Sequence, residues 1–214
     1  MASDEIVHVV DDDEAVRDSL RFLLQSAGLA VRVHASAESF LADTGQHATG
    51  CVLTDVRMPG ADGLQLQSRL RDLGVPLMVI VMTGHGEIPV AVQAMKNGAV
   101  DFLEKPFNDT QLLDAVGRAL AVSRASQAAM AGSAMAAARL ASLTPREREV
   151  LDGLVAGLGS KAIALELGSS PRTVEVHRTR VMAKLGVHSL PELVRVVQAA
   201  DPAKSTHPAK STGA

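Results

Sequence analysis

The chain has 214 residues and a formal net charge of −3. Hydrophobic residues make up 47% of it, which is enough to build folded cores and excludes a wholly disordered chain. Aromatic residues make up only 2%, so a nucleic-acid binder that stacks bases on aromatic side chains is not expected.

The small net charge conceals an uneven distribution of charge along the chain. Residues 1–121 carry 9 basic and 17 acidic side chains, a net charge of −8. Residues 122–214 carry 12 basic and 7 acidic side chains, a net charge of +5. An acidic front and a basic back predict two modules with different partners, and the length fits two domains of roughly 100 residues each.

Cysteine content and hydropathy indicate the compartment. Cys51 is the single cysteine, so neither a disulfide framework nor a thiolate zinc site is expected. The first residues are acidic before they are apolar, unlike a signal peptide. The longest apolar run, Leu77 to Met82, is far shorter than the roughly 20 residues of a spanning helix. We expect a cytoplasmic protein without a membrane partner.

In the first half, short apolar runs alternate with stretches of helical apolar spacing. The helical spacing is clear at Val16, Leu20 and Leu23. The short runs lie at residues 6–10, 30–34, 51–54, 77–82 and 101–103. This alternation predicts an α/β domain, a doubly wound five-stranded parallel sheet covered by helices on both faces.

Acidic, hydroxyl and lysine side chains follow four of these predicted strands. Asp11, Asp12 and Asp13 follow the first strand, Asp55 the third, Thr83 the fourth and Lys105 the fifth. The carboxyl ends of parallel strands meet at one edge of the sheet, so these groups should converge. Converging carboxylates need a cation such as Mg²⁺, and a lysine and a hydroxyl add donors for phosphoryl oxygens. The set predicts a phosphoryl-transfer centre with a carboxylate nucleophile.

Each of these residues also has a simpler explanation. The aspartates after the first strand could cap the helix that follows, and Asp55 could be a turn residue before Met58-Pro59-Gly60. Haloacid-dehalogenase-like phosphatases also place an aspartate at a strand end. They need a second aspartate two residues later as general acid, and Arg57 occupies that position here. The joint placement on four strands favours the phosphoryl-transfer site.

The segments VVDDDEAVRDSL, LTDVRMPGADGL, IVMTGHGE and DFLEKPF resemble the receiver domain of response regulators, which we assign to residues 4–121. The resemblance implies a flavodoxin-like fold, a sensor histidine kinase as phosphodonor and a usually cis Lys105–Pro106 bond. It implies no enzyme activity beyond the domain's own phosphotransfer and dephosphorylation. The implied site residues are Asp55 as phosphoacceptor, Asp11, Asp12, Asp55 and the backbone carbonyl of Arg57 as Mg²⁺ ligands, Thr83 and Lys105 as phosphoryl-binding groups, and Thr83 with Phe102 as the switch.

Phosphorylation would add roughly two negative charges at an acidic edge. Thr83 would then move toward the phosphoryl group, and Phe102 would turn into the space left behind. A helix from about Pro89 to Asn97 would present Val92 and Lys96 on one stripe. We expect a phosphorylation-dependent homodimer through this face.

Residues 122–142 are rich in alanine and predict a linker that is partly helical and broken near Gly132-Ser133. The tail, residues 201–214, repeats the segment PAKST and has no apolar periodicity. We expect the tail to be disordered.

Four short helices are predicted between residues 143 and 200. Thr144 before Pro145 and Glu147 marks the start of the first. The second runs from Ser160 to Leu167, the third from Pro171 to about Leu185, and the fourth starts near Ser189. A helix, a tight turn at Gly168-Ser169 and a second helix with basic exposed residues is the geometry of DNA readers.

Charge alone is weak support for DNA binding, because residues 143–200 carry 8 basic and 6 acidic side chains and could form an ordinary solvated surface. The segments LTPREREVLDGLVAG and IALELGSSPRTVEVHRTRVMAKLGVHS resemble the LuxR-type helix-turn-helix more specifically. By position, base contacts fall to Glu175, Val176 and Thr179, and the candidates for phosphate contacts are Lys161, Arg172, Thr173, Arg178, Arg180 and Lys184.

Together these resemblances indicate a response regulator of the FixJ type that binds double-stranded promoter DNA. Pairing through the fourth helix would give a roughly palindromic DNA site. Region four of sigma factors shares much of the helical pattern, but a receiver in front argues against it and leaves contact with RNA polymerase open. The alternative from another class is a phosphorylation-independent DNA binder whose receiver serves only as an interaction module.

Overall fold

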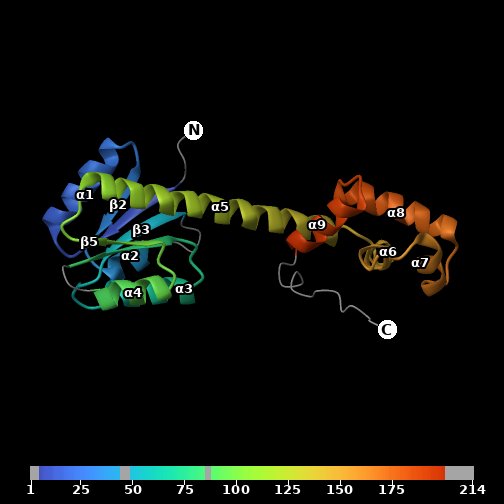
Figure 1. The fold of residues 1–214 in the computed structure, drawn as a ribbon, viewed down its shortest axis with the longest axis horizontal. Helices are drawn as coiled ribbons and strands as arrows, with labels where there is room; N and C mark the ends of the chain where they lie inside the picture. Colours follow the sequence, from blue (N-terminus) through green and yellow to red (C-terminus); the bar gives the residue numbers. More distant parts are fainter. Residues whose placement is uncertain (1–4, 44–48, 85–87, 201–214) are drawn as a thin grey trace. The chain divides into compact units, whose positions relative to one another are not determined.

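The computed structural model describes residues 5–43, 49–84 and 88–200 (Figure 1). It divides into two compact units, residues 1–127 and residues 128–214, and we describe each by itself. The predicted tail at 201–214 lies outside the described residues.

The N-terminal unit is built on a five-stranded parallel sheet with the order β2-β1-β3-β4-β5. The predicted strand positions are confirmed to within a residue or two at each end. The strands are β1 Ile6–Val10, β2 Ala30–His34, β3 Gly50–Asp55, β4 Met78–Thr83 and β5 Asp101–Glu104. Every residue of the central strand β3 is buried, as expected for a parallel sheet covered on both faces.

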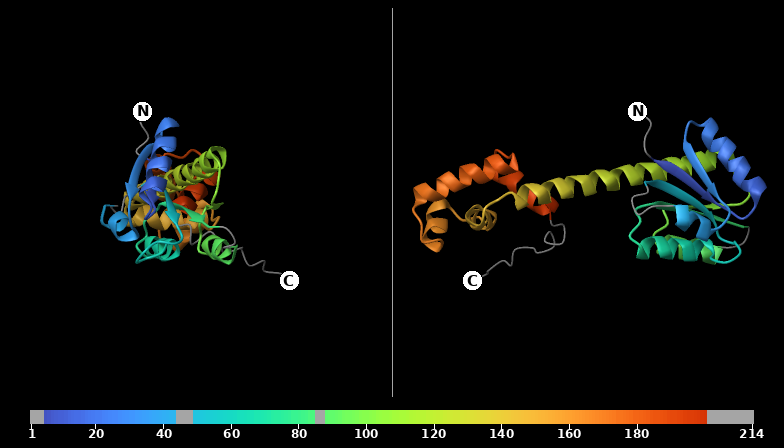
Figure 2. Two further views of the ribbon diagram at one scale, coloured as in Figure 1. Left: turned by 90° about the vertical axis from the view of Figure 1, so that its left-hand side faces the viewer. Right: turned by 180° about the vertical axis from the view of Figure 1, so that it is seen from behind.

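Helices cover both faces of this sheet, as Figures 1 and 2 show. One face packs against α1 (Glu14–Ser26) and α5 (Asp109–Ala141), with Leu24 and Leu112 fully buried between them and the sheet. The other face packs against three helices, which are α2 (Ala37–Asp43), α3 (Gly63–Asp72) and α4 (Ile88–Lys96). The predicted doubly wound fold is therefore confirmed.

Helix α5 corrects one expectation about the linker. The break expected near Gly132-Ser133 is wrong, because α5 continues from Asp109 to Ala141 without interruption. A glycine inside a helix costs about 1 kcal/mol relative to alanine, and the surrounding alanines are the best helix formers. The boundary between the two units falls inside this helix, between Gln127 and Ala128.

The C-terminal unit contains four helices after α5, close to their predicted positions. They are α6 Pro145–Val155, α7 Ser160–Glu166, α8 Pro171–Leu185 and α9 Leu190–Ala200. Thr144 and Glu147 form the predicted capping box at the start of α6. Gly168 adopts φ +57° in the turn between α7 and α8, a conformation that favours glycine, and Ser170 then caps α8. The core of this unit contains Val174, Val181 and Leu185 of α8.

Among the described helices, none combines the length and the apolar character needed to cross a bilayer.

Candidate functional site

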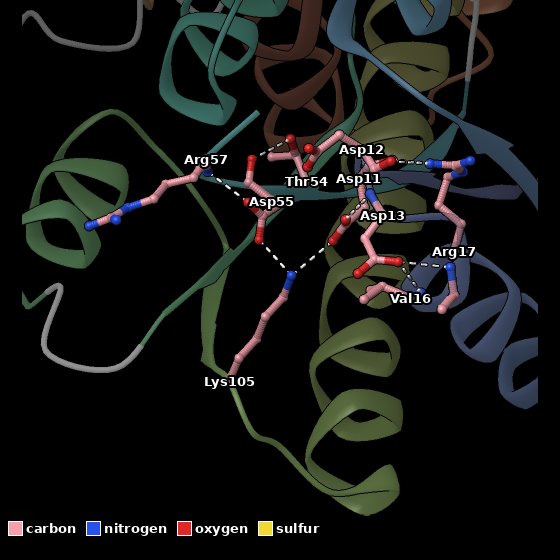
Figure 3. Close-up of polar contacts among 10 residues, drawn as sticks. Asp11, Asp12, Asp13, Val16, Arg17, Thr54, Asp55, Arg57 and Lys105 are labelled. Carbon is pink, nitrogen blue, oxygen red and sulfur yellow. Dashed lines mark hydrogen bonds and ion pairs between the residues drawn. The ribbon is translucent and has the colours of Figure 1, made fainter. Parts of the chain in front are cut away.

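Three of the predicted site residues converge at the carboxyl edge of the sheet, shown in Figure 3. Asp11 follows β1 and Asp55 ends β3, and these two strands are neighbours in the centre of the sheet. The chain order reverses between β1 and β3, and such a switch point is where open α/β sheets bind ligands. Lys105 reaches the same point from the residue after β5.

The Lys105 ammonium bridges two carboxylates. Its Nζ donates to Asp55 Oδ1 at 2.6 Å and to Asp11 Oδ2 at 2.8 Å. Both aspartate side chains are largely buried, so little water reaches them to screen their charge. The ammonium of Lys105 takes over part of that role by neutralising the two carboxylates. The Lys105–Pro106 peptide bond is cis, as the family resemblance implied.

The second oxygen of Asp55 is also held. Asp55 Oδ2 accepts a hydrogen bond of 2.7 Å from the backbone N–H of Arg57. The first residue of α3, Gly63, packs directly on this strand end, where an added Cβ would lie only 2.3 Å from the Asp55 carbonyl oxygen. The carboxylate is therefore presented from a rigid strand end in one orientation.

Burial and neighbouring charges shift the pKa values of Asp55 and Lys105 in opposite directions. Burial raises the pKa of the Asp55 carboxyl above its usual value, against the hydrogen bond and charge of Lys105. Burial also disfavours the Lys105 ammonium, but its bonds to Asp11 and Asp55 outweigh this and raise the pKa of Lys105. The opposing effects of burial and of charge thus meet at the hydrogen bonds that Lys105 donates to Asp11 and Asp55.

The acidic loop after β1 is ordered by its own backbone and by a residue that the sequence reasoning missed. Asp11 Oδ1 accepts from the Asp13 N–H at 2.9 Å, and Asp13 caps α1, as the simpler explanation of this run proposed. Arg17 donates from Nη1 to the carbonyl oxygens of Asp11 and Asp12, each at 2.8 Å. A basic residue one turn into the helix after an acidic run is the sequence signal that could have identified Arg17.

The predicted metal ligands are only partly gathered. Asp11 and Asp55 meet at Lys105, whereas the Asp12 side chain is exposed at the same strand end. In the described part of the chain, no group of three or more histidine, cysteine, aspartate or glutamate residues is placed to hold a metal ion by itself.

The predicted switch residues share a cavity of about 270 Å³ beside the site. Thr83 is buried at the end of β4, and Phe102 in β5 is 42% exposed. Val92 and Lys96 of α4, which we predicted as a dimer face, are exposed and line the same cavity. Thr83 at the end of β4 and the exposed face of α4 thus line one apolar hollow.

In the C-terminal unit, α8 exposes most of the predicted DNA-contacting residues. Glu175, Val176 and Thr179 lie exposed on the helix, and so do Arg172, Thr173 and Arg180, while Arg178 is half-buried. Lys161 is exposed on α7. Met182 of α8 is partly buried against the core.

Lys184 is also exposed on α8, but its ammonium has partners within the unit. Its Nζ donates to Glu147 Oε2 at 2.6 Å and to the Ser142 carbonyl at 3.2 Å, which ties α8 to the start of α6. Glu147 is buried, and the bond to Lys184 lowers the pKa of its carboxyl to about 2. Lys184 therefore has a structural partner within the unit, and its contact with a DNA phosphate stays a prediction.

Two family models match the chain. The model described as the response regulator receiver domain matches residues 7–117, and the model described as bacterial regulatory proteins of the luxR family matches residues 141–197.

Curated relatives match nearly the whole chain. The transcriptional regulatory protein FixJ of Azorhizobium caulinodans is 53% identical over 190 residues, which covers 89% of this chain and 90% of the relative. FixJ of Rhizobium meliloti is 50% identical, with coverage of 92% and 97%.

Solved structures of response regulators match the chain over most of its length. A low-resolution structure of the response regulator StyR matches with a TM-score of 0.82 at 41% identity, covering 92% of this chain and 99% of StyR. Full-length FixJ from B. japonicum matches with a TM-score of 0.58 at 48% identity, covering 92% and 97%.

Proposed function

Because the chain belongs to the FixJ-type response regulators, transcriptional regulators of two-component systems, we propose that phosphorylation of Asp55 by a sensor histidine kinase controls its binding to promoter DNA. The observation that carries this proposal is the geometry of Asp55. Its carboxylate is held at a strand end, with Lys105 at 2.6 Å on one oxygen and the Arg57 N–H at 2.7 Å on the other.

In the transfer step, one Asp55 carboxylate oxygen attacks the phosphorus of a kinase phosphohistidine. The new O–P bond forms as the P–N bond breaks, and the imidazole nitrogen leaves with the bonding electron pair. Lys105 stays within reach of the phosphoryl oxygens that arrive on Asp55, and the Thr83 hydroxyl supplies a second donor. The chemistry that we propose is confined to this aspartate and the reversal of its phosphorylation.

The donor set at this edge suits a magnesium ion. Asp11 and Asp55 already converge on one positive group, the Lys105 ammonium. Mg²⁺ is commonly held by one or two carboxylates, with water and phosphate oxygens completing its ligands. Asp11, Asp12, Asp55 and the backbone carbonyl of Arg57 would hold it. When bound, the ion would neutralise charge on the transferring phosphoryl group.

Phosphorylation would then change the α4 face. Thr83 would be drawn toward the new phosphoryl oxygens, and Phe102 would turn into the cavity that both residues line. We propose that this change relieves inhibition of the DNA-binding unit and promotes a homodimer through Val92 and Lys96.

In the DNA-binding unit, α8 would enter the major groove with Glu175, Val176 and Thr179 toward the bases. The phosphate contacts, which position the helix without specifying sequence, would come from Lys161, Arg172, Thr173, Arg178, Arg180 and Lys184. A dimer would bind a roughly palindromic site in double-stranded DNA.

The test compares wild type with Asp55→Asn, a variant of nearly the same size that lacks the nucleophile. With Mg²⁺ and a small-molecule phosphodonor such as acetyl phosphate, intact-mass spectrometry should detect one phosphoryl group on wild type and none on the variant. DNA affinity should rise only for wild type. Equal DNA affinity of the two proteins under these conditions would favour the alternative in which the receiver is only an interaction module.

A further inference from the structure

The recognition helix α8 carries an acidic side chain among its exposed residues. The Glu175 side chain is 56% exposed, on the helix that we propose enters the major groove. A carboxylate near DNA is repelled by the phosphates, so it weakens binding unless it accepts a hydrogen bond from a base. The contacts that orient the Glu175 carboxylate therefore decide whether it can accept a hydrogen bond from a base.

One oxygen of Glu175 is held by a residue from the preceding helix. Ser160, the first residue of α7, donates its hydroxyl hydrogen to Glu175 Oε1. Arg178 Nη1 lies 3.8 Å from the same oxygen. Among the residues that the structure describes, Glu175 Oε2 has no hydrogen-bonding partner. The protein thus anchors one oxygen and leaves the other available.

The hydroxyl of Thr179, which is also on α8, does not hydrogen-bond to the Glu175 carboxylate. Thr179 Oγ1 donates to the Glu175 backbone carbonyl at 3.0 Å, which uses its one hydrogen within the helix. Thr179 therefore offers only acceptor oxygen and a methyl group to its surroundings. Ser160 is the hydroxyl that reaches the Glu175 carboxylate.

The free oxygen of Glu175 matches an amino group in the major groove. An ionised carboxylate is only an acceptor. Cytosine presents the N4 amino donor in the major groove, whereas adenine presents its N6 amino donor beside the N7 acceptor. A carboxylate facing adenine would place its lone pairs against N7. Cytosine is therefore the better partner.

We propose that Ser160 is a specificity-determining positioning residue, which holds Glu175 Oε1 so that Oε2 accepts a hydrogen bond from cytosine N4. This inference rests on the proposed DNA-binding function and names one base that it reads. Ser160 itself acts through Glu175 and does not contact the base.

The experiment selects bound sequences from a library of random-sequence DNA duplexes, using the full chain with acetyl phosphate and Mg²⁺. Wild type should enrich cytosine at one position of each half-site. Ser160→Ala should reduce that preference about tenfold while preferences at the other positions persist. Ser160→Thr, which keeps a hydroxyl, should restore it. Glu175→Gln should shift the same position toward adenine, because an amide can pair with both N6 and N7.

Lys161→Ala is the matched control, since it changes the adjacent exposed residue and should weaken binding evenly at every position. The inference would be overturned if Ser160→Ala kept the cytosine preference of wild type. It would also be overturned if Ser160→Ala weakened binding evenly at every position, as Lys161→Ala should. Preferences retained at other positions show that the variant is folded. If wild type selects no sequence at all, the proposed DNA-binding function fails, and the inference fails with it.

Discussion

Gly63 shows how a single residue type supports the backbone that carries Asp55, the proposed phosphoacceptor. The start of α3 presses against the strand end that carries Asp55, and the Gly63 N–H donates to the Val56 carbonyl at 3.1 Å. A Cβ at this position would lie 2.3 Å from the Asp55 carbonyl oxygen, which is backbone and cannot move aside cheaply. Gly117, in the middle of α5, has no atom within 4 Å of an added Cβ.

The two glycines predict opposite effects of the same substitution. Gly63→Ala should destabilise the fold by about 1–3 kcal/mol, because the backbone around Asp55 must shift to admit the methyl group. Gly117→Ala should stabilise it by about 0.5–1 kcal/mol, because alanine is the better helix former. Urea unfolding followed by far-ultraviolet circular dichroism measures both. A Gly63→Ala variant as stable as wild type would show that the backbone at Asp55 can admit a Cβ at this position without cost.

At the scale of elements, β1, β2 and α2 enclose a buried pair of histidines. His8 Nδ1 and His34 Nε2 lie 3.1 Å apart, and Phe40 of α2 packs edge-on against both rings. Burial, followed by the charge of His34, lowers the pKa of His8 to about 4. Burial also lowers the pKa of His34, which is modulated by the opposing charges of Asp43 and Arg32. Both rings are therefore neutral in the folded protein at neutral pH.

This cluster predicts that the receiver loses stability in mild acid. The unfolded chain binds a proton on His8 near its ordinary pKa of 6.5, whereas the folded chain binds it only near 4, so stability falls as the pH drops from about 6.5 to about 4. The expected loss between about pH 7 and about pH 5 is about 2 kcal/mol, to order of magnitude. Amide hydrogen exchange of peptides from β1 and β2 measures this loss of stability in the full chain.

His8→Gln is the matched variant, since glutamine can donate to His34 but does not titrate. Its β1 and β2 peptides should lose less protection over this pH range than those of wild type. An unchanged loss in the variant would assign the acid sensitivity to other groups.

At the scale of the whole molecule, an acidic receiver unit precedes a DNA-binding unit whose folded helices are only weakly basic. Residues 143–200 carry 8 basic and 6 acidic side chains, so a single copy has little net attraction for DNA. Dimerisation would double the contacts that each binding event makes. This is why we place control of DNA binding at the α4 face, beside the cavity of Thr83 and Phe102.

The predicted readout is the sedimentation coefficient. Wild type treated with acetyl phosphate and Mg²⁺ should sediment as a dimer, and Val92→Asp should remain a monomer under the same conditions, because a buried carboxylate opposes association. Val122→Asp is the matched control, since Val122 is 45% exposed and Val92 is 47% exposed, yet Val122 lies on α5. A phosphorylated wild type that sediments as a monomer, or equal loss in both variants, would contradict the α4 dimer.

Much of the fold and part of the site could be predicted from local patterns. The strands followed from short apolar runs, the start of α6 from Thr144, Pro145 and Glu147, and the edge location of Asp55 from its place after a buried strand. The break in α5 was predicted wrongly, because glycine and serine lower helix propensity without ending a helix of good formers. The ion pair between Lys184 and buried Glu147 could not be predicted, because their sequence positions do not reveal that the two side chains lie within 2.6 Å of each other.

The sequence by itself determined the type and order of the elements, the family resemblance and the residue types at each strand end. These depend on apolar periodicity and short motifs, which are properties of neighbouring residues. Only the tertiary structure decided that one lysine binds both Asp11 and Asp55, that Arg17 secures the acidic loop and that Ser160 holds Glu175. Such contacts depend on side-chain direction and on distances between separate elements, and no periodicity along the chain specifies either.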